Sequence, residues 1–167
     1  PVTLRQMDFA ESHGFKRIYL GVKQKLNPDW PGSESCKEFA EETLAQIGNS
    51  DAILDANNPS EINLTDEYIK SHSLNTEQVR LYISRSVTGA AKAILDAGLE
   101  ARLMCVGGDT LLALMQAVKV YELVPVCEIE KGVVLTSFNY RGKNYYIMAK
   151  SGGFGEENLL VKIAGQQ

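Results

Sequence analysis

The sequence predicts an α/β fold with three layers, in which a mainly parallel sheet carries helices on both faces and a C-terminal hairpin adds antiparallel strands. Short apolar runs alternate with helical patterns over most of the chain, which is typical of strand–helix–strand units. Two glycine-rich segments stand directly between a strand and a helix, where open α/β sheets bind ligands. Near the C terminus, two strand-like runs flank a turn sequence, which predicts the hairpin.

The first third of the chain contains one expected helix, two expected strands and a loop. Apolar residues at three-residue steps over 4–10 predict a helix that ends at Gly14. The runs KRIYL at 16–20 and DAILD at 51–55 are short and partly β-branched, so each is expected to be a strand. The segment 27–32 contains two prolines and a glycine and is expected to be a loop.

Two longer helical patterns follow this loop. The first is expected to begin with a capping box at 35–38 and to end at Gly48. The second, over 79–97, is the strongest periodic pattern in the chain, and Thr76 is its expected N-cap. The stretch 57–75 between them is polar and broken, so we expect an exposed excursion there.

The last part of the chain combines another strand–helix pair with the hairpin. A strand is expected at 102–106 (RLMCV), followed by glycines and a helix over 111–118. The runs 133–138 and 144–149 are expected to pair around the turn sequence NYRG. A glycine-rich loop then leads into a short final helix over 157–163.

Composition and charge exclude several classes of protein. The 167 residues are 44% hydrophobic and 23% charged, as in an ordinary globular protein, so we expect a single domain over residues 1–167. The net charge is −4 and no Lys/Arg cluster occurs, which argues against binding to nucleic acid or to an anionic membrane. No apolar run approaches the roughly 18 residues that a membrane-spanning helix needs.

The cysteines and histidines indicate neither a disulfide framework nor a metal site. Cys36, Cys105 and Cys127 are odd in number and widely spaced, so we expect reduced, buried thiols in a cytoplasmic protein. His13 and His72 have no metal-ligand spacing, and no protein metal site is expected. The chain offers no convincing pair of nucleophile and base, so no catalytic residue is assigned.

The first glycine segment is VGGDT at 106–110. Gly107 and Gly108 lack Cβ atoms where the chain leaves the strand, so a ligand can approach the backbone closely. The helix behind them offers unpaired N–H groups and a partial positive charge, which attract anions. Asp109 would repel a phosphate directly, so it is expected to cap the helix, to hold a ribose hydroxyl or to reach Mg²⁺ through water. The alternative is a tight turn in which Asp109 or Thr110 only caps the helix.

The second glycine segment is KSGGFG at 150–155, and its three glycines in four residues exceed what a turn needs. Lys150 is expected either to face a phosphate or to be solvated. Phe154 is expected to pack, although it could also offer a surface to a flat ring. Neither segment matches a P-loop or a dinucleotide-binding motif. If neighbouring strand ends bring both segments to one place, they could hold one nucleotide.

Three stretches together resemble the C-terminal nucleotide-binding domain of the four-carbon acid sugar kinases: GLEARLMCVGGDT at 98–110, GVVL at 132–135 and KSGGFG at 150–155. Residues 1–6 also resemble the helix that follows a Gly-Ser strand end in that domain. These enzymes phosphorylate threonate, erythronate and 3-oxo-tetronate with ATP. The resemblance implies that ATP, with Mg²⁺ neutralising its phosphates, is held by Gly107, Gly108, Asp109, Thr110 and either Gly152 or Gly153.

The resemblance further implies an ATP-dependent sugar-acid kinase with two domains. The chain is expected to be a fragment that lacks the sugar-acid-binding domain, which would supply the acceptor hydroxyl and its base. On its own it should bind nucleotide weakly and transfer no phosphoryl group. Expected partners are the nucleotide, the missing domain and other copies of the chain. Two alternatives stay open: a nucleotide-free ligand-binding or regulatory α/β module, and a small α/β enzyme that acts on another phosphorylated metabolite.

Overall fold

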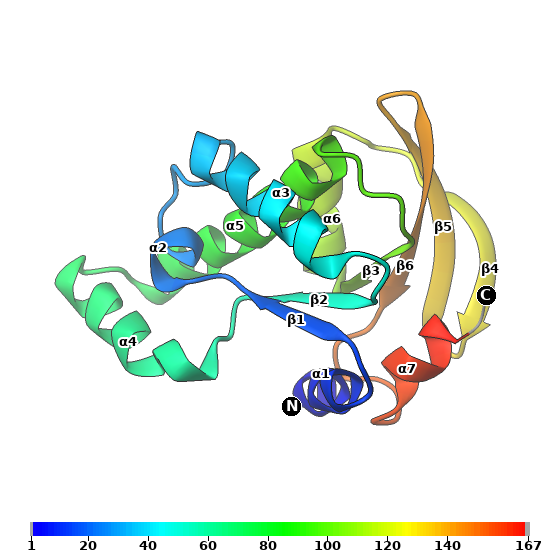
Figure 1. Ribbon diagram of the computed structural model, residues 1–167, viewed down its shortest axis with the longest axis horizontal. Helices are drawn as coiled ribbons and strands as arrows, with labels where there is room; N and C mark the ends of the chain where they lie inside the picture. Colours follow the sequence, from blue (N-terminus) through cyan, green and yellow to red (C-terminus); the bar gives the residue numbers. More distant parts are fainter. Residues whose placement is uncertain (1, 166–167) are drawn as a thin grey trace. The chain divides into compact units, whose positions relative to one another are not determined.

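The computed structural model describes residues 2–165 and contains seven α-helices and two sheets in that range (Figure 1). The chain divides into two compact units. Unit 1 comprises residues 1–16 and 100–167, and unit 2 comprises residues 17–99. The organisation as a single domain over 1–167 stays a prediction, and the two units are described separately.

Unit 1 is built on a four-stranded sheet of mixed direction. Its order is β3 (Leu103–Val106), β6 (Lys143–Lys150), β5 (Val133–Tyr140) and β4 (Val124–Glu130). Only β3 and β6 are parallel, whereas β6 with β5 and β5 with β4 are antiparallel. The expectation of a mainly parallel sheet is therefore wrong here. The physical reason is that consecutive strands joined by short turns must pair antiparallel.

The hairpin between β5 and β6 forms where the sequence predicts it. Its turn residues Arg141 and Gly142 have φ values of 51° and 78°. Two successive positive φ values are the signature of a type I′ turn, whose twist matches that of the flanking strands. The strand β4 was not expected, because its segment contains a proline and two glutamates that weaken the strand pattern.

Helices cover both faces of this sheet in unit 1. The short helix α7 (Leu159–Ala164) lies beside β5 and β6 (Figure 1). Its Leu159 and Ile163 pack with Val133 of β5 and Met148 of β6. The helix α6 (Gly108–Val118) contacts β3 and β6. Because side chains alternate along a strand, Ile147 faces away from α7. The helix α1 (Val2–Ser12) packs against α7.

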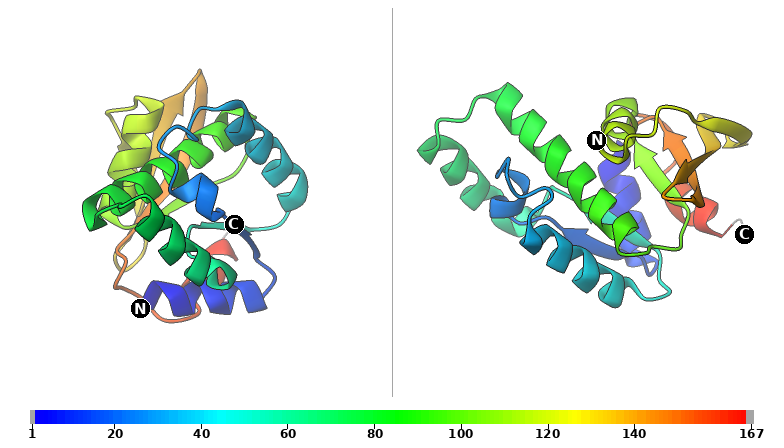
Figure 2. Two further views of the ribbon diagram at one scale, coloured as in Figure 1. Left: turned by 90° about the vertical axis from the view of Figure 1, so that its left-hand side faces the viewer. Right: turned by 90° about the horizontal axis from the view of Figure 1, so that it is seen from above.

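Unit 2 combines a two-stranded sheet with a pair of long helices. The strands are β1 (Lys16–Tyr19) and β2 (Ala52–Asp55), and the helices α3 (Glu34–Ile47) and α5 (Thr76–Asp96) lie side by side (Figure 2). The unit also contains α2 (Val22–Lys25), the 3₁₀ turn η1 (Pro59–Glu61) and α4 (Ile62–Ser71). The core of unit 2 contains the buried residues Leu20, Trp30, Cys36 and Ala90.

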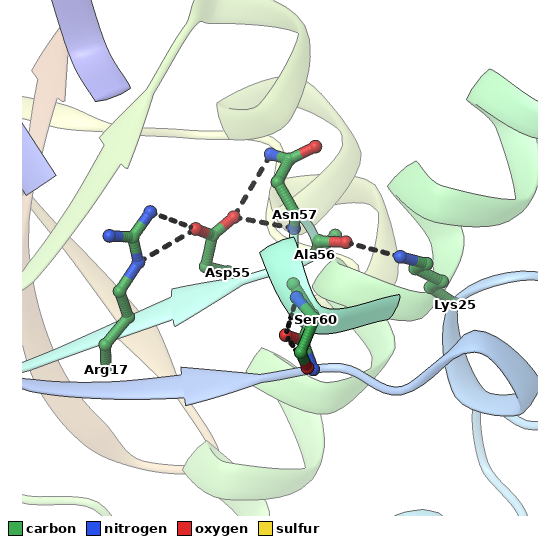
Figure 3. Close-up of polar contacts among 7 residues, drawn as sticks. Arg17, Lys25, Asp55, Ala56, Asn57 and Ser60 are labelled. Atoms are coloured by element: carbon green, nitrogen blue, oxygen red, sulfur yellow. Dashed lines mark hydrogen bonds and ion pairs between the residues drawn. The ribbon is translucent and has the colours of Figure 1, made fainter. Parts of the chain in front are cut away.

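Polar contacts surround the C-terminal end of β2 in unit 2 (Figure 3). Arg17 donates from Nε and one Nη to a single carboxylate oxygen of Asp55, at 3.0 and 2.7 Å, and both side chains are almost fully buried. The other oxygen of Asp55 accepts from the backbone and side-chain amides of Asn57. Lys25 donates to the carbonyl of Ala56 at 3.0 Å.

Two helix boundaries and one stretch expected to be irregular differ from the sequence predictions in unit 2. Ser33, not Ser35, caps α3, because its side chain accepts from the N–H of Cys36. Asn75, not Thr76, caps α5 and forms a capping box with Gln78. The stretch 57–75 contains η1 and α4, although α4 has no buried residue, which explains why its sequence is largely polar.

Two side chains lie in surroundings that the sequence did not predict. Cys127 is exposed on β4, whereas Cys36 and Cys105 are buried as expected, and all three are free thiols. Ser86 in α5 is buried, although serine is usually exposed, and it donates to the carbonyl of Gln24 at 2.8 Å. Within residues 2–165, no helix is long and apolar enough to cross a membrane.

Candidate functional site

The two glycine segments begin side by side in unit 1. The parallel strands β3 and β6 are in register at their last residues, Val106 and Lys150. The N–H of Gly107 donates to the carbonyl of Lys150 at 2.8 Å. The chain therefore leaves both strands at the same edge of the sheet, which is where α/β proteins bind ligands.

The first segment forms the N-terminus of α6. Gly107 has a φ of 96°, a conformation that favours glycine, and α6 begins at Gly108. In the described part of the chain, the N–H groups of Gly108, Asp109 and Thr110 donate to no protein acceptor. No side chain caps this helix, so the interpretation that Asp109 or Thr110 serves only as a cap is wrong. Three backbone donors are therefore left for a ligand or for water.

Packing does not require most of these glycines to lack a side chain. A Cβ at Gly108 or Gly153 would meet no atom within 4 Å, and one at Gly152 would only touch Thr3 Oγ1 at 4.0 Å. Gly155 is different, because its φ is 93° and a Cβ there would overlap the side chain of Leu159. The open space at Gly108, Gly152 and Gly153 is thus available to a bound molecule.

The second segment is held from α1 and from the β4–β5 turn. Thr3 Oγ1 donates to the carbonyl of Gly152 at 2.6 Å, and Gln6 Nε2 donates to the carbonyls of Phe154 and Glu156 at 3.1 and 2.8 Å. The ring of Phe154 lies over Gly132, whose Cβ would be 3.2 Å from the ring. Phe154 is still 37% exposed, so it packs on a turn rather than in the core.

Lys150 is a candidate binding residue whose burial could not be predicted from the sequence. Its side chain is only 2% exposed, although lysine is almost never fully buried without an ionic partner. Its Nζ donates to the carbonyl of Ser151 at 2.8 Å and forms no ion pair within residues 2–165. Burial lowers the pKa of Lys150 from its ordinary value, and no acidic neighbour opposes this effect. An uncompensated positive charge therefore lies at the base of the second glycine segment.

Metal ligands are sparse in the part of the chain that the structure describes. No group of three or more His, Cys, Asp or Glu side chains there could hold a metal ion. Asp109 is the acidic residue at the start of α6 and makes no hydrogen bond with its carboxylate. A divalent cation could therefore be held here only with oxygen ligands from a bound molecule or from water.

Solved structures from three bacteria share this fold. A protein from Haemophilus influenzae that belongs to a family of unknown function, DUF1537, aligns over 99% of this chain and 37% of its own, with 16% identity and a TM-score of 0.71. A DUF1537 protein from Bordetella bronchiseptica, a domain-swapped dimer with bound citrate, aligns over 98% and 35%, with 17% identity and a TM-score of 0.66. A Salmonella typhimurium LT2 protein with a provisional tRNA synthase name aligns over 97% and 37%, with 18% identity and a TM-score of 0.67.

The chain thus spans little more than a third of the length of these structures. The comparison with curated proteins found no match. A family model described as "nucleotide-binding C-terminal domain" matches residues 1–160, a range that includes both glycine segments and α1. The protein belongs to the family of nucleotide-binding C-terminal domains.

Proposed function

We propose that this chain is the ATP-binding part of a kinase that phosphorylates a four-carbon sugar acid. The family supports nucleotide binding in general. The resemblance of both glycine segments to the four-carbon acid sugar kinases supports ATP and the sugar acid. The Bordetella bronchiseptica structure contains citrate, a hydroxy acid, which is in keeping with an acidic substrate for the longer proteins.

The observation that carries the proposal is the set of positive groups at the joined ends of β3 and β6. The open N–H groups of Gly108, Asp109 and Thr110 lie at the positive end of the α6 dipole. The buried ammonium of Lys150 adds a full charge on the adjacent strand. A triphosphate is the nucleotide group that such donors stabilise best, because each can pair with a phosphate oxygen.

The residues present also fit a magnesium complex of ATP. Mg²⁺ usually keeps several waters and binds through phosphates and one or two carboxylates. Asp109 is exposed beside the proposed phosphate site, and its carboxylate could reach the ion through water. The ion would neutralise charge on the transferred phosphoryl group, which is a main requirement of phosphoryl transfer.

In this proposal, a part of the protein beyond this chain provides the site for the acceptor hydroxyl and the base that activates it. At the site in unit 1 we assign the backbone donors, the lysine and the aspartate to binding and orienting the phosphates, and we assign the sugar acid to the part of the protein beyond this chain. The chain by itself should therefore bind ATP without phosphorylating threonate or erythronate. Turnover by the 167-residue chain alone would contradict this division of roles.

Calorimetric titration with ATP, with and without Mg²⁺, tests the proposal. We expect saturable binding that is tighter with Mg²⁺ and that weakens in the Gly108→Ala variant. Lys25→Met is a matched control, because Lys25 lies in unit 2 outside the proposed site. No binding of ATP by a folded chain would favour the alternative of a nucleotide-free regulatory module and would refute the proposal.

A further inference from the structure

The side chains of Thr3 and Gln6 stabilise an irregular loop rather than a helix or a strand. They donate three hydrogen bonds to the carbonyls of Gly152, Phe154 and Glu156. All three acceptors lie in the second glycine segment or directly after it. Side chains of α1 thus donate to every second carbonyl over residues 152–156 of the loop. These bonds fix the orientation of the peptide planes between them.

The orientation of these carbonyls determines where the neighbouring N–H groups point. In a trans peptide unit, the C=O of one residue and the N–H of the next point in opposite directions. Because the carbonyls of Gly152 and Phe154 face α1, the N–H groups of Gly153 and Gly155 point away from it. Neither of these N–H groups has an acceptor within the described residues. Two backbone donors are therefore presented on the side of the loop opposite α1.

We propose that Thr3 and Gln6 are positioning residues that orient the N–H groups of Gly153 and Gly155 toward the phosphates of a bound nucleotide. This inference rests on the proposed nucleotide binding but adds a second set of backbone donors to those of α6. Successive N–H groups that point in one direction form an anion-binding concavity. Lys150, which donates to the carbonyl of Ser151, begins the same loop and adds positive charge.

The buried amide of Gln6 supports a role beyond packing. Gln6 is fully buried, and its Oε1 accepts no hydrogen bond within residues 2–165. An unpaired buried acceptor destabilises a fold, and an apolar side chain of similar size would avoid this cost. The two donations from Nε2 to the loop are what glutamine contributes at this position and methionine could not.

The test compares Thr3→Val with Thr3→Ser. Valine keeps the shape of threonine but cannot donate to the carbonyl of Gly152, whereas serine can. We expect Thr3→Val to weaken binding of ATP with Mg²⁺ by about fivefold to tenfold, the scale of one hydrogen bond. Thr3→Ser should stay within about twofold of the unaltered chain. Both variants should melt close to the unaltered chain, because Thr3 is only half-buried.

Amide NMR spectra of the same proteins without nucleotide separate this inference from the proposed function. We expect Thr3→Val to shift the Gly153 signal and to change its hydrogen exchange, and Thr3→Ser to leave both unchanged. A Thr3→Val variant with unaltered ATP affinity and an unaltered Gly153 signal would overturn the positioning role. If the unaltered chain binds no ATP but Thr3→Val moves the Gly153 signal, the proposed function fails while the anchoring of the loop by Thr3 stands.

Discussion

Each unit of this protein has a buried lysine that bonds to a backbone carbonyl just after a strand, but the surroundings of Lys25 and Lys150 differ. Lys25 in unit 2 is 4% exposed and bonds to the carbonyl of Ala56 beside the end of β2 (Figure 3). Burial lowers its pKa, and the carboxylates of Glu61 and Asp55 act in the opposite direction. Lys150 in unit 1 is 2% exposed and bonds to the carbonyl of Ser151, and burial lowers its pKa with no acidic group to oppose it.

Under the proposed function, this difference distinguishes Lys25, which is structural, from Lys150, which binds the nucleotide. Buried charges are normally stabilised by partners of opposite charge, because an isolated ion loses its hydration without compensation. Unit 2 supplies such charges within its own fold. Unit 1 does not, and the open N–H groups of α6 lie on the neighbouring strand end. An anion bound in unit 1 would give Lys150 the nearby negative charge that Glu61 and Asp55 give Lys25.

The largest expected effect concerns the charged network of unit 2. Asp55→Ala removes a carboxylate that pairs with the buried Arg17 guanidinium and should lower the free energy of unfolding by about 3–5 kcal/mol. Urea denaturation followed by circular dichroism measures this change. ATP affinity of the remaining folded protein should be unchanged. A large loss of affinity without a loss of stability would mean that the network of unit 2 belongs to the binding site.

Alanine substitutions at two glycines of unit 1 should have different effects, because one should lower stability and the other should lower ATP affinity. Gly155→Ala should destabilise the protein by about 2–4 kcal/mol, because its φ is positive and the new Cβ would overlap Leu159. Gly108→Ala should leave the melting temperature nearly unchanged, because nothing lies within 4 Å of its Cβ and alanine favours a helix. The same substitution should weaken ATP binding by about 1–3 kcal/mol, since a buried polar contact is left unmade.

Thermal melts and titrations of both variants check this pair. The outcome that contradicts the site is a Gly108→Ala variant that binds ATP as tightly as the unaltered chain. A Gly108→Ala variant that melts far below the unaltered chain would instead indicate that this glycine is needed for the backbone.

The two lysines provide a matched pair of substitutions. Lys150→Met should weaken ATP binding by about tenfold to a hundredfold, the scale of a charge-assisted hydrogen bond, and should keep or raise stability because it removes an uncompensated buried charge. Lys25→Met should lower stability, because Glu61 and Asp55 lose a nearby positive charge, and should leave ATP affinity unchanged. Calorimetry and denaturation of both proteins measure these changes. Equal behaviour of the two variants would remove the distinction between the units.

The smallest expected effect is a pH dependence. The pKa of Lys150 is lower in the folded than in the unfolded chain, so above the folded pKa and up to the ordinary value of 10.5 the unfolded chain binds more protons. Stability should therefore gain from Lys150 as pH rises through this window, and Lys150→Met should lose that gain. Bound phosphates raise the pKa again, so ATP affinity should fall as pH rises. Melting curves and titrations across the alkaline range test both signs.

Local sequence signals predicted most elements of the fold but not the pairing of the strands. The glycines, the apolar periodicity and the NYRG turn identified α1, α5, α6 and the β5–β6 hairpin, because each depends on neighbours in the sequence. The mixed direction of the sheet and the strand β4 depend on partners that periodicity does not reveal. The exposure of Cys127 follows from its place on this unexpected edge strand.

The candidate site, like the fold, could be predicted from the sequence only in part. The glycine segments were visible as motifs, and the strand ends do lie together as expected. The burial of Lys150 was not visible, because a lysine in a polar, glycine-rich segment is usually solvated. The roles of Thr3 and Gln6 also depend on contacts with residues about 150 positions away, which no single-sequence pattern indicates.

The most direct test of the difference between the units is an amide NMR titration of the whole chain with ATP and Mg²⁺. We expect the largest signal changes at Gly108, Asp109, Gly152 and Gly153 of unit 1. Amides around Lys25 and Asn57 of unit 2 should move little. Changes confined to unit 2, or no changes even at a large molar excess of ATP with Mg²⁺, would contradict the assignment of nucleotide binding to the joined strand ends of unit 1.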